Sequence, residues 1–234
     1  MTTFHLITLF PESFESYLNA SIIKRAQEKG KISIKYYNPR DFAVGKNGKK
    51  AKTYAERRVD NRPYGGGPGM VIEALPVIKA IDKAVGQKVK RSKGQKVKIV
   101  FFSPAGKQFS NEMADDFKKY TDIVFVCGRY EGIDARVKKV FPMVDVSVGP
   151  YVVTGGELPA LISIDAITRR IPGVLGDDLS VEEMRVASPD VYTRPEVIEY
   201  KKKKYRVPKV LLSGHHAKMD EWKVNRKSKT RGQK

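Results

Sequence analysis

Four segments of the chain combine several glycines with residues that a packed core does not require. Residues 60–70 read DNRPYGGGPGM, and residues 102–106, 126–134 and 147–159 read FSPAG, VCGRYEGID and SVGPYVVTGGELP. Glycine lets a backbone approach a ligand closely, and a flexible linker rarely holds Arg, Tyr and two prolines so close together. These segments therefore favour ligand binding or catalysis over simple connection.

Three of these segments follow apolar runs that we expect to be strands, at residues 97–102, 123–127 and 143–148. In an open α/β sheet, ligands bind outside the carboxyl ends of the strands. One such segment alone would be an ordinary strand-to-helix turn. Three together predict a single binding crevice at one edge of the sheet.

The residues of these segments limit the kind of ligand. The chain has no G-x-G-x-x-G after an expected strand and no G-x-x-x-x-G-K-[ST], so neither a pyrophosphate cradle nor a Walker lysine is indicated. The segments offer backbone amides and carbonyls, a tyrosine and the carboxylate of Glu131. Such a pocket suits a nucleoside that has a positive centre and no phosphate. S-adenosylmethionine fits this description, because a carboxylate would favour its sulfonium.

The elements that position these segments alternate between strands and helices. Apolar spacing predicts strands at 4–10, 32–36, 97–102, 123–127 and 143–148, and helices at 13–29, 75–85, 110–120, 133–140 and 157–171. This alternation is typical of an α/β domain with a mainly parallel sheet. The composition changes after Gly176. We therefore expect one domain at 1–175, an acidic linker at 176–186, and a small, basic, α-helical domain at 187–234.

The charge of the chain is strongly positive and unevenly distributed. The formal net charge is +19, from 45 Lys+Arg and 26 Asp+Glu. Residues 201–234 hold 13 basic and 2 acidic residues, and the segments 46–58 and 88–98 are also basic. Clustered cations gain affinity for polyanions by releasing counterions from phosphates, which favours a nucleic acid as partner. Solubility and attraction to a membrane surface are the alternatives.

The composition also indicates in which cellular compartment the protein is expected. No apolar run approaches the ~20 residues of a membrane span, and the first residues, MTTFHLITLFPE, lack the basic start of a signal peptide. The single cysteine, Cys127, excludes an internal disulfide framework and a cysteine-rich zinc site. His215 and His216 have no third ligand at metal spacing nearby. We expect a cytoplasmic protein without a membrane segment or a bound structural metal.

Six motifs together give a specific resemblance. DNRPYGGGPGM, CGRYEGID, GPYVVTGGELPA, RRIPGVLG, YTRPEV and VPKVLLSGHH keep their order over about residues 4 to 222. The set closely resembles the bacterial tRNA (guanine-N1-)-methyltransferase family, usually called TrmD. The resemblance implies the SPOUT class, with a deep trefoil knot in the α/β domain and a homodimer whose active site lies at the subunit interface. It also implies transfer of a methyl group from S-adenosyl-L-methionine to N1 of the guanosine immediately 3′ of the anticodon in tRNA, with magnesium assisting.

The resemblance also implies site residues. Donor-binding residues carried over by motif are Phe102, Ser103, Pro104, Gly128, Tyr130, Glu131, Val148, Gly149, Tyr151, Val153, Gly155, Gly156 and Pro159. Residues expected to contact the tRNA are Arg62, Tyr64, Gly67, Gly69, Tyr192, Arg194 and His215, with the lysines at 201–204 as sequence-independent phosphate contacts.

Two residues are expected to act in catalysis. Arg169 suits the charge that develops on guanine O6, and a carboxylate should take the N1 proton. The family has an aspartate in the linker where this chain has Met184, so we assign the proton to the neighbouring Glu183 as a hypothesis, with Glu182, Asp178 and Asp190 as alternatives. The second domain is also shorter than is usual, ending about twelve residues past Trp222.

Two other functions stay open from the sequence. One is a SPOUT methyltransferase with another RNA target, although that leaves the GGGPGM and YTRP segments unexplained. The other is a catalytically silent tRNA- or ribosome-binding protein, to which the missing aspartate gives some weight.

Overall fold

The structure is a computed structural model, and it describes residues 1–45, 51–53, 55–86, 96–175 and 190–231. The chain divides into two compact units, Met1–Leu175 and Gly176–Lys234. Each unit is described by itself. The side chains of the second unit are described as far as residue 225.

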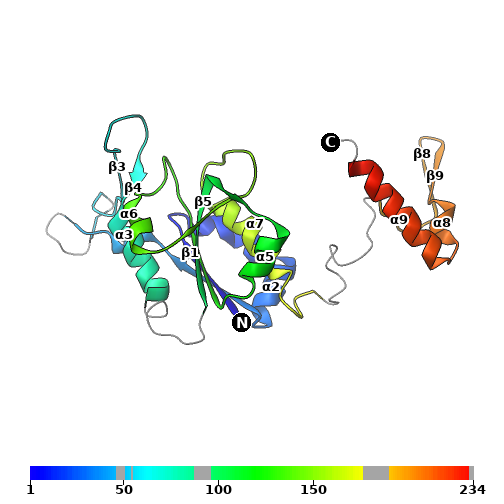
Figure 1. Ribbon diagram of the computed structural model, residues 1–234, viewed down its shortest axis with the longest axis horizontal. Coiled ribbons are helices and arrows are strands. Elements are labelled where there is room, and N and C mark those ends of the chain that lie inside the picture. The colour runs from blue at the N-terminus through cyan, green and yellow to red at the C-terminus, as the bar shows by residue number, and fades with distance from the viewer. Residues whose placement is uncertain (46–50, 54, 87–95, 176–189, 232–234) are drawn as a thin grey trace. The chain divides into compact units, whose positions relative to one another are not determined.

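The first unit is built on a five-stranded sheet in the order β2-β1-β6-β5-β7. The strands are β1 (Thr2–Ile7), β2 (Ile32–Tyr37), β5 (Val97–Gln108), β6 (Asp122–Val126) and β7 (Val144–Ser147). All four neighbouring pairs are parallel. The prediction of an α/β fold with a mainly parallel sheet is confirmed (Figure 1).

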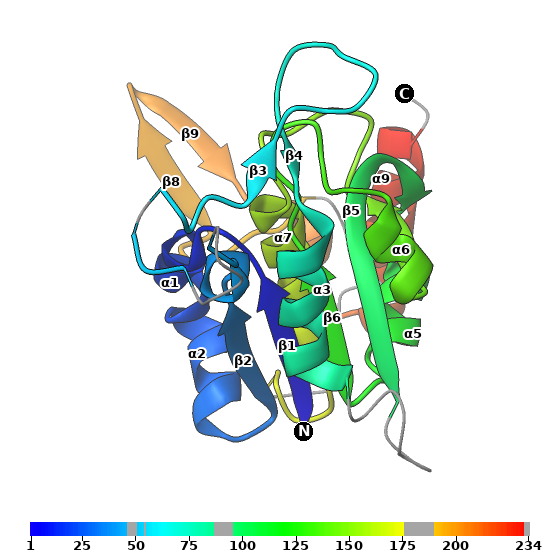
Figure 2. The same cartoon turned by 90° about the vertical axis from the view of Figure 1, so that its left-hand side faces the viewer.

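Helices cover both faces of this sheet because its central strands are apolar on both faces. Phe4 and Leu6 of β1 belong to one buried cluster, and Ile7 of the same strand belongs to the other. The first cluster packs against α1 (Glu15–Leu18), α2 (Ser21–Glu28), α5 (Asn111–Phe117) and α7 (Glu157–Thr168). The second packs against α3 (Ala74–Ile81) and α6 (Arg136–Val140), on the opposite side of the sheet (Figures 1 and 2).

The single helix expected at 13–29 is wrong. A 3-10 turn, η1 (Pro11–Phe14), leads into α1, and α2 begins only at Ser21, after Ala20 in an extended conformation. Phe14 and Ile23 are both buried in the same cluster. Nine residues apart, they would lie on opposite sides of one continuous helix at about 3.6 residues per turn. The break lets both side chains reach the core.

Shorter elements join these parts. They are η2 (Pro39–Phe42), the strands β3 (Asp60–Asn61) and β4 (Val71–Ile72), which pair in antiparallel fashion, and the π-helical turn η3 (Asp82–Gly86) that extends α3. Most of the described residues between 39 and 70 are irregular, as expected for a long loop. None of the helices in the described ranges is long and apolar enough to cross a membrane.

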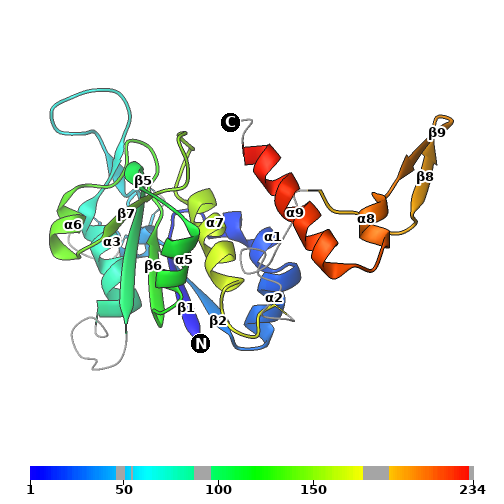
Figure 3. The same ribbon diagram turned by 45° about the vertical axis from the view of Figure 1, so that its right-hand side comes forward.

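The described part of the second unit is a hairpin followed by two helices (Figure 3). The hairpin pairs β8 (Val197–Tyr200) with β9 (Lys203–Arg206), and α8 (Lys209–Leu212) and α9 (His216–Arg231) follow. The sequence reading expected helices alone in this region. It missed the hairpin because Lys201 and Lys202 occupy the turn, where glycine or asparagine is the usual signal.

Candidate functional site

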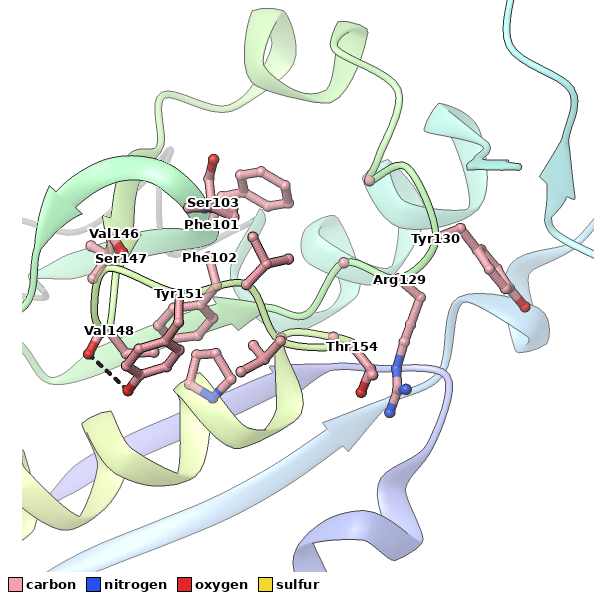
Figure 4. Close-up of a pocket in the computed structure, with 18 of the residues that line it drawn as sticks. Phe101, Phe102, Ser103, Arg129, Tyr130, Val146, Ser147, Val148, Tyr151 and Thr154 are labelled. Atoms are coloured by element: carbon pink, nitrogen blue, oxygen red, sulfur yellow. Dashed lines mark hydrogen bonds between the residues drawn. The ribbon is translucent and has the colours of Figure 1, made fainter. Parts of the chain in front are cut away.

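A loop that interrupts β5 and the loops that follow β6 and β7 border a pocket of about 290 Å³ (Figure 4). This volume is at the lower end of the range for small-molecule sites. The lining residues are Phe101, Phe102, Ser103, Pro104, Gly128, Arg129, Tyr130, Glu131, Gly132, Val146, Ser147, Val148, Tyr151, Val152, Val153, Thr154, Gly155, Gly156 and Pro159. All of the expected donor-binding residues except Gly149 line it.

The first loop is an interruption within β5. Phe102 and Lys107 both pair with Val146, so the residues between them leave the ladder and Ser103 and Pro104 reach the pocket. Gly106 lets the strand resume, because a Cβ there would lie 2.5 Å from the backbone nitrogen of Val146. The resulting loop supplies one wall of the pocket.

Close backbone approach joins the second and third loops. The amide of Gly156 donates to the carbonyl of Gly128 at 2.9 Å. A Cβ on Gly156 would lie 2.5 Å from the Cα of Cys127, so only glycine fits at this contact. Burial raises the pKa of the Cys127 thiol well above its ordinary value, which keeps this side chain neutral beneath the pocket. Backbone therefore packs directly against backbone where the second and third loops meet.

Gly149 does not line the pocket but lies against Tyr151, which does. Its amide and carbonyl both contact the hydroxyl of Ser147, at 3.3 and 2.9 Å. A Cβ on Gly149 would collide with the ring of Tyr151, whose hydroxyl donates to the carbonyl of Val148 at 3.3 Å. Glycine at this position is what allows the Tyr151 ring to fold back against the loop (Figure 4).

A buried carboxylate connects the two loops to the end of β1. Glu157, at the first turn of α7, accepts a hydrogen bond from Thr8 at 2.8 Å, and its other oxygen lies 2.9 Å from the Nε of Arg129. The Arg129 guanidinium lies 4.7 Å from the ring centroid of Phe10. Glu157 is 3% exposed, and a helix N-terminus further favours its charge. One side chain thus fixes three segments that are distant in sequence.

The pocket keeps one negative charge that is not neutralised. Arg129 is paired with Glu157. The other acid in the lining is Glu131, and no cation in the described part of the chain lies within ion-pair distance of it. A ligand with a positive centre would be attracted to this carboxylate.

The loop at 60–70 is attached to the wall of the pocket. The amide of Glu131 donates to the carbonyl of Met70 at 3.0 Å, and the amide of Ile72 donates to the carbonyl of Gly132 at 3.0 Å. Gly69 lacks the Cβ that would lie 2.6 Å from Oε1 of Glu131. Just beyond this wall, Asp134 forms an ion pair with Arg136, whose guanidinium holds the pKa of the Asp134 carboxyl below its usual range.

The outer part of this loop is uncovered. Tyr64 is 101% exposed, and Gly67 has a positive φ with open space where a Cβ would point. The expected tRNA-binding residues Arg62, Tyr64, Gly67 and Gly69 therefore lie together on one exposed loop beside the pocket.

The remaining expected site residues do not lie at this pocket. Arg169 follows the last residue of α7, about 15 Å beyond Pro159 at 1.5 Å per residue. Glu183 lies outside the described residues. Tyr192 and Arg194 line an open groove of the second unit with Leu211 and Leu212, and His215 precedes α9 on an exposed turn.

The expectation of no metal ligands stays a prediction. Among the residues that the structure describes, no three His, Cys, Asp or Glu side chains gather as a metal site would require.

Sequence reasoning missed Arg129, Glu157 and Thr8 as parts of the site. Arg129 and Glu157 stand within two of the glycine segments, but nothing in the sequence pairs two residues 28 positions apart. The feature of the sequence that could have identified Glu157 is an acid at the start of an otherwise apolar helix, directly after two glycines.

Replacing Arg129 by Met should lower the free energy of unfolding by about 3 kcal/mol, because it leaves the Glu157 carboxylate buried without its cation. Adding Glu157→Gln should recover part of that loss, since glutamine is uncharged and still accepts from Thr8. Urea unfolding followed by far-UV circular dichroism measures both. Arg136→Met is the control, with a side chain 68% exposed and an expected cost below about 1 kcal/mol. If the losses in unfolding free energy of the Arg129 and Glu157 changes simply added in the double variant, this would contradict the pairing of the two side chains.

Comparison with known proteins adds an independent line of evidence. The family described as tRNA (Guanine-1)-methyltransferase TrmD matches residues 2–234. The chain is 42% identical over 224 residues to the tRNA (guanine-N(1)-)-methyltransferase of Clostridioides difficile, covering 94% of this chain and 90% of that protein.

Two further relatives carry the same name. The Carboxydothermus hydrogenoformans protein is 40% identical over 222 residues, covering 93% of this chain and 79% of the relative. The Staphylococcus epidermidis protein is 40% identical over 225 residues, covering 94% and 84%. With a family match over nearly its whole length and relatives this similar, the chain belongs to the tRNA (guanine-1)-methyltransferase family.

Proposed function

We propose that this protein transfers a methyl group from S-adenosyl-L-methionine to N1 of the guanosine immediately 3′ of the anticodon in tRNA. The observation that carries the proposal is the arrangement at the carboxyl edge of the sheet. A pocket whose lining includes Glu131, a carboxylate with no ion-pair partner among the described residues, adjoins an exposed, glycine-rich loop that is hydrogen-bonded to its wall. A donor and an acceptor site are therefore adjacent. Membership of the methyltransferase family supports both assignments.

The pocket fits the donor on chemical grounds. The Gly156–Gly128 contact leaves backbone where side chains would otherwise fill the space, and Phe102 and Tyr151 offer flat apolar surfaces for an adenine ring. Glu131 provides the charge complementary to the sulfonium. When bound, S-adenosyl-L-methionine supplies an electrophilic methyl group. The chain's own residues orient it and exclude water from one side.

The trefoil knot of the SPOUT class belongs to this proposal. The strand order supports it, because β7 lies on the far side of β5 from β6. After β7 the chain returns past β5, so that Gly156 meets Gly128 in the loop that follows β6.

Methylation at N1 requires loss of a proton from a weakly nucleophilic nitrogen. A carboxylate beside N1 accepts the proton, and a cation beside O6 stabilises the charge that develops there. We assign the first role to Glu183 of the linker and the second to Arg169. The guanine must leave the anticodon stack to reach the donor, and Tyr64 is exposed and free to stack on a neighbouring base.

We also propose a homodimer whose active site combines two chains. Within one chain Arg169 lies at the opposite end of α7 from the pocket, too distant to contact a base seated beside the donor. Leu158 and Ile162 lie on one face of the same helix and are 59% and 46% exposed. A second copy packed on this face would cover apolar surface and bring its own Arg169 to the pocket.

The proposal also includes assistance by magnesium and a location in the cytoplasm. The described residues gather no carboxylate cluster for magnesium, so no step above depends on that ion. The cytoplasm is the compartment in which we expect the enzyme to meet its tRNA.

Incubation of the protein with S-adenosyl-L-methionine and tRNA transcripts should yield N1-methylguanosine at the position 3′ of the anticodon, and at no other nucleotide. Nuclease digestion with mass spectrometry, together with primer extension, measures the product and its position. A methyl group elsewhere would assign the enzyme to another RNA target. Absence of both product and donor binding would indicate a silent RNA-binding protein.

Replacing Glu131 by Gln should weaken S-adenosyl-L-methionine binding by about threefold to tenfold, because the sulfonium loses its nearby charge. Binding of S-adenosylhomocysteine, which has a neutral thioether, should change little. Calorimetric titration of both ligands measures the difference, with Asp116→Asn at the surface as control. An equal loss for the two ligands would show that Glu131 does not act on the sulfonium.

Mixed dimers test whether Arg169 acts on the pocket of the other chain. Gly149→Val displaces the ring of Tyr151 and should abolish donor binding, and Arg169→Ala should abolish transfer, so both homodimers should be inactive. A heterodimer of the two, isolated through different affinity tags, should regain about half the wild-type rate, because one of its two sites is intact. No recovery in the heterodimer would place Arg169 and the donor pocket of one chain in the same site.

A further inference from the structure

The hairpin of the second unit presents an exposed aromatic face. Ile198, Tyr200 and Tyr205 are 55%, 62% and 51% exposed. Ile198 pairs with Tyr205, and Tyr200 pairs with Lys203. Since paired residues and alternate residues of a strand share a face, these four side chains lie on the same side of the hairpin. A two-stranded hairpin is marginal in water, so an uncovered face of this kind suits a partner.

The tip of the same hairpin is strongly cationic. Lys201 and Lys202 form the turn with φ of 50° and 61°, and Lys203 and Lys204 follow directly. The Lys201 ammonium lies 5.3 Å from the ring centroid of Tyr200. From 197 to 206 the hairpin holds five cations and the single acid Glu199. Aromatic rings and ammonium groups therefore occupy one continuous surface.

The base of the hairpin adjoins the groove that contains Tyr192 and Arg194. The amide of Val207 donates to the carbonyl of Glu196 at 2.9 Å and closes the hairpin there. Glu196 and Val207 also line the groove. The aromatic face thus extends a surface that already holds a tyrosine and an arginine.

We propose that this face, formed by Ile198, Tyr200, Lys203 and Tyr205 with the lysine tip, binds unpaired nucleotides of the tRNA. Tyrosine rings stack on exposed bases of any identity, and lysines contact the phosphates between them. Base-paired RNA offers phosphates but hides the faces of its bases, so the tyrosines select single-stranded segments. The inference rests on the proposed function for the identity of the RNA and adds a second point of contact, separate from the target guanosine.

The test uses the full chain and separates stacking from charge. Tyr200→Leu and Tyr205→Leu keep apolar area and remove the rings, and Tyr200→Trp and Tyr205→Trp keep stacking. Lys201→Gln and Lys202→Gln remove phosphate contacts. All four positions are exposed, and unchanged S-adenosyl-L-methionine binding verifies that the first unit is intact.

Each Leu substitution should weaken tRNA binding by at least about fivefold and raise KM for tRNA, with kcat at saturating tRNA unchanged. The Trp variants should bind as the wild type does. The slope of log affinity against log salt should stay constant in the Leu variants and fall by about 0.7 for each Lys→Gln change. A single-stranded RNA dodecamer should bind better than a duplex of equal length, and the Leu variants should lose this preference.

Two outcomes would overturn the proposal. One is wild-type tRNA affinity and KM in the double Leu variant of an enzyme that does form N1-methylguanosine. The other is loss of binding to anionic lipid vesicles, and not to RNA, in the Leu variants. Failure of the proposed function gives a different result, namely RNA binding that depends on the tyrosines without any methylated product.

Discussion

The buried contact between Glu157 and Arg129 is the constraint on which the pocket and the proposed donor site depend. Through Thr8 it also fixes the end of β1, so one carboxylate holds segments near residues 8, 129 and 157 together. Glu157 begins α7, and a helix is stiff. The position of its first turn therefore determines where the exposed face with Leu158 and Ile162 points and where Arg169 lies at the other end of the helix. The pocket and the proposed subunit interface are thereby coupled through a single helix, which explains how a change at one could be felt at the other.

Where the loops around the pocket meet, backbone packs closely against its neighbours, and this explains why the sequence motifs are so rich in glycine. At Gly156 and Gly106 the neighbouring atom is itself backbone, and neither side can yield. At Gly149 the neighbour is the ring of Tyr151, which can move. The glycines are thus not equivalent. Gly106 and Gly156 preserve the backbone path of the loops, and Gly149 preserves the position of the Tyr151 side chain, which lines the pocket.

Much of the first unit could be predicted because its central strands are buried on both faces and therefore appear in the sequence as short continuous apolar runs, as at 123–127. The convergence of three loops followed from the parallel sheet alone. The break at Ala20 could not be predicted, since it depends on Phe14 and Ile23 meeting the same cluster in three dimensions. The hairpin was missed because lysines replace the expected turn residues. The position of Arg169 at the end of α7 followed from the length of that helix, which the sequence did indicate. Its distance from the pocket of the same chain depends on how α7 is oriented against the sheet, which the sequence does not indicate.

The distribution of charge follows from the opposite charges of the two substrates. A donor with a sulfonium is positive, and a tRNA is a polyanion, so one surface cannot attract both. In the first unit Arg129 is neutralised by Glu157, which leaves Glu131 as the net charge of the pocket within a chain of +19. Cations are instead gathered on the hairpin of the second unit, which is the surface proposed to contact phosphates. Pairing Arg129 with Glu157 therefore keeps a basic protein locally acidic at this pocket. Salt should screen both attractions and weaken the binding of both ligands, with a much steeper effect on tRNA, which makes many phosphate contacts.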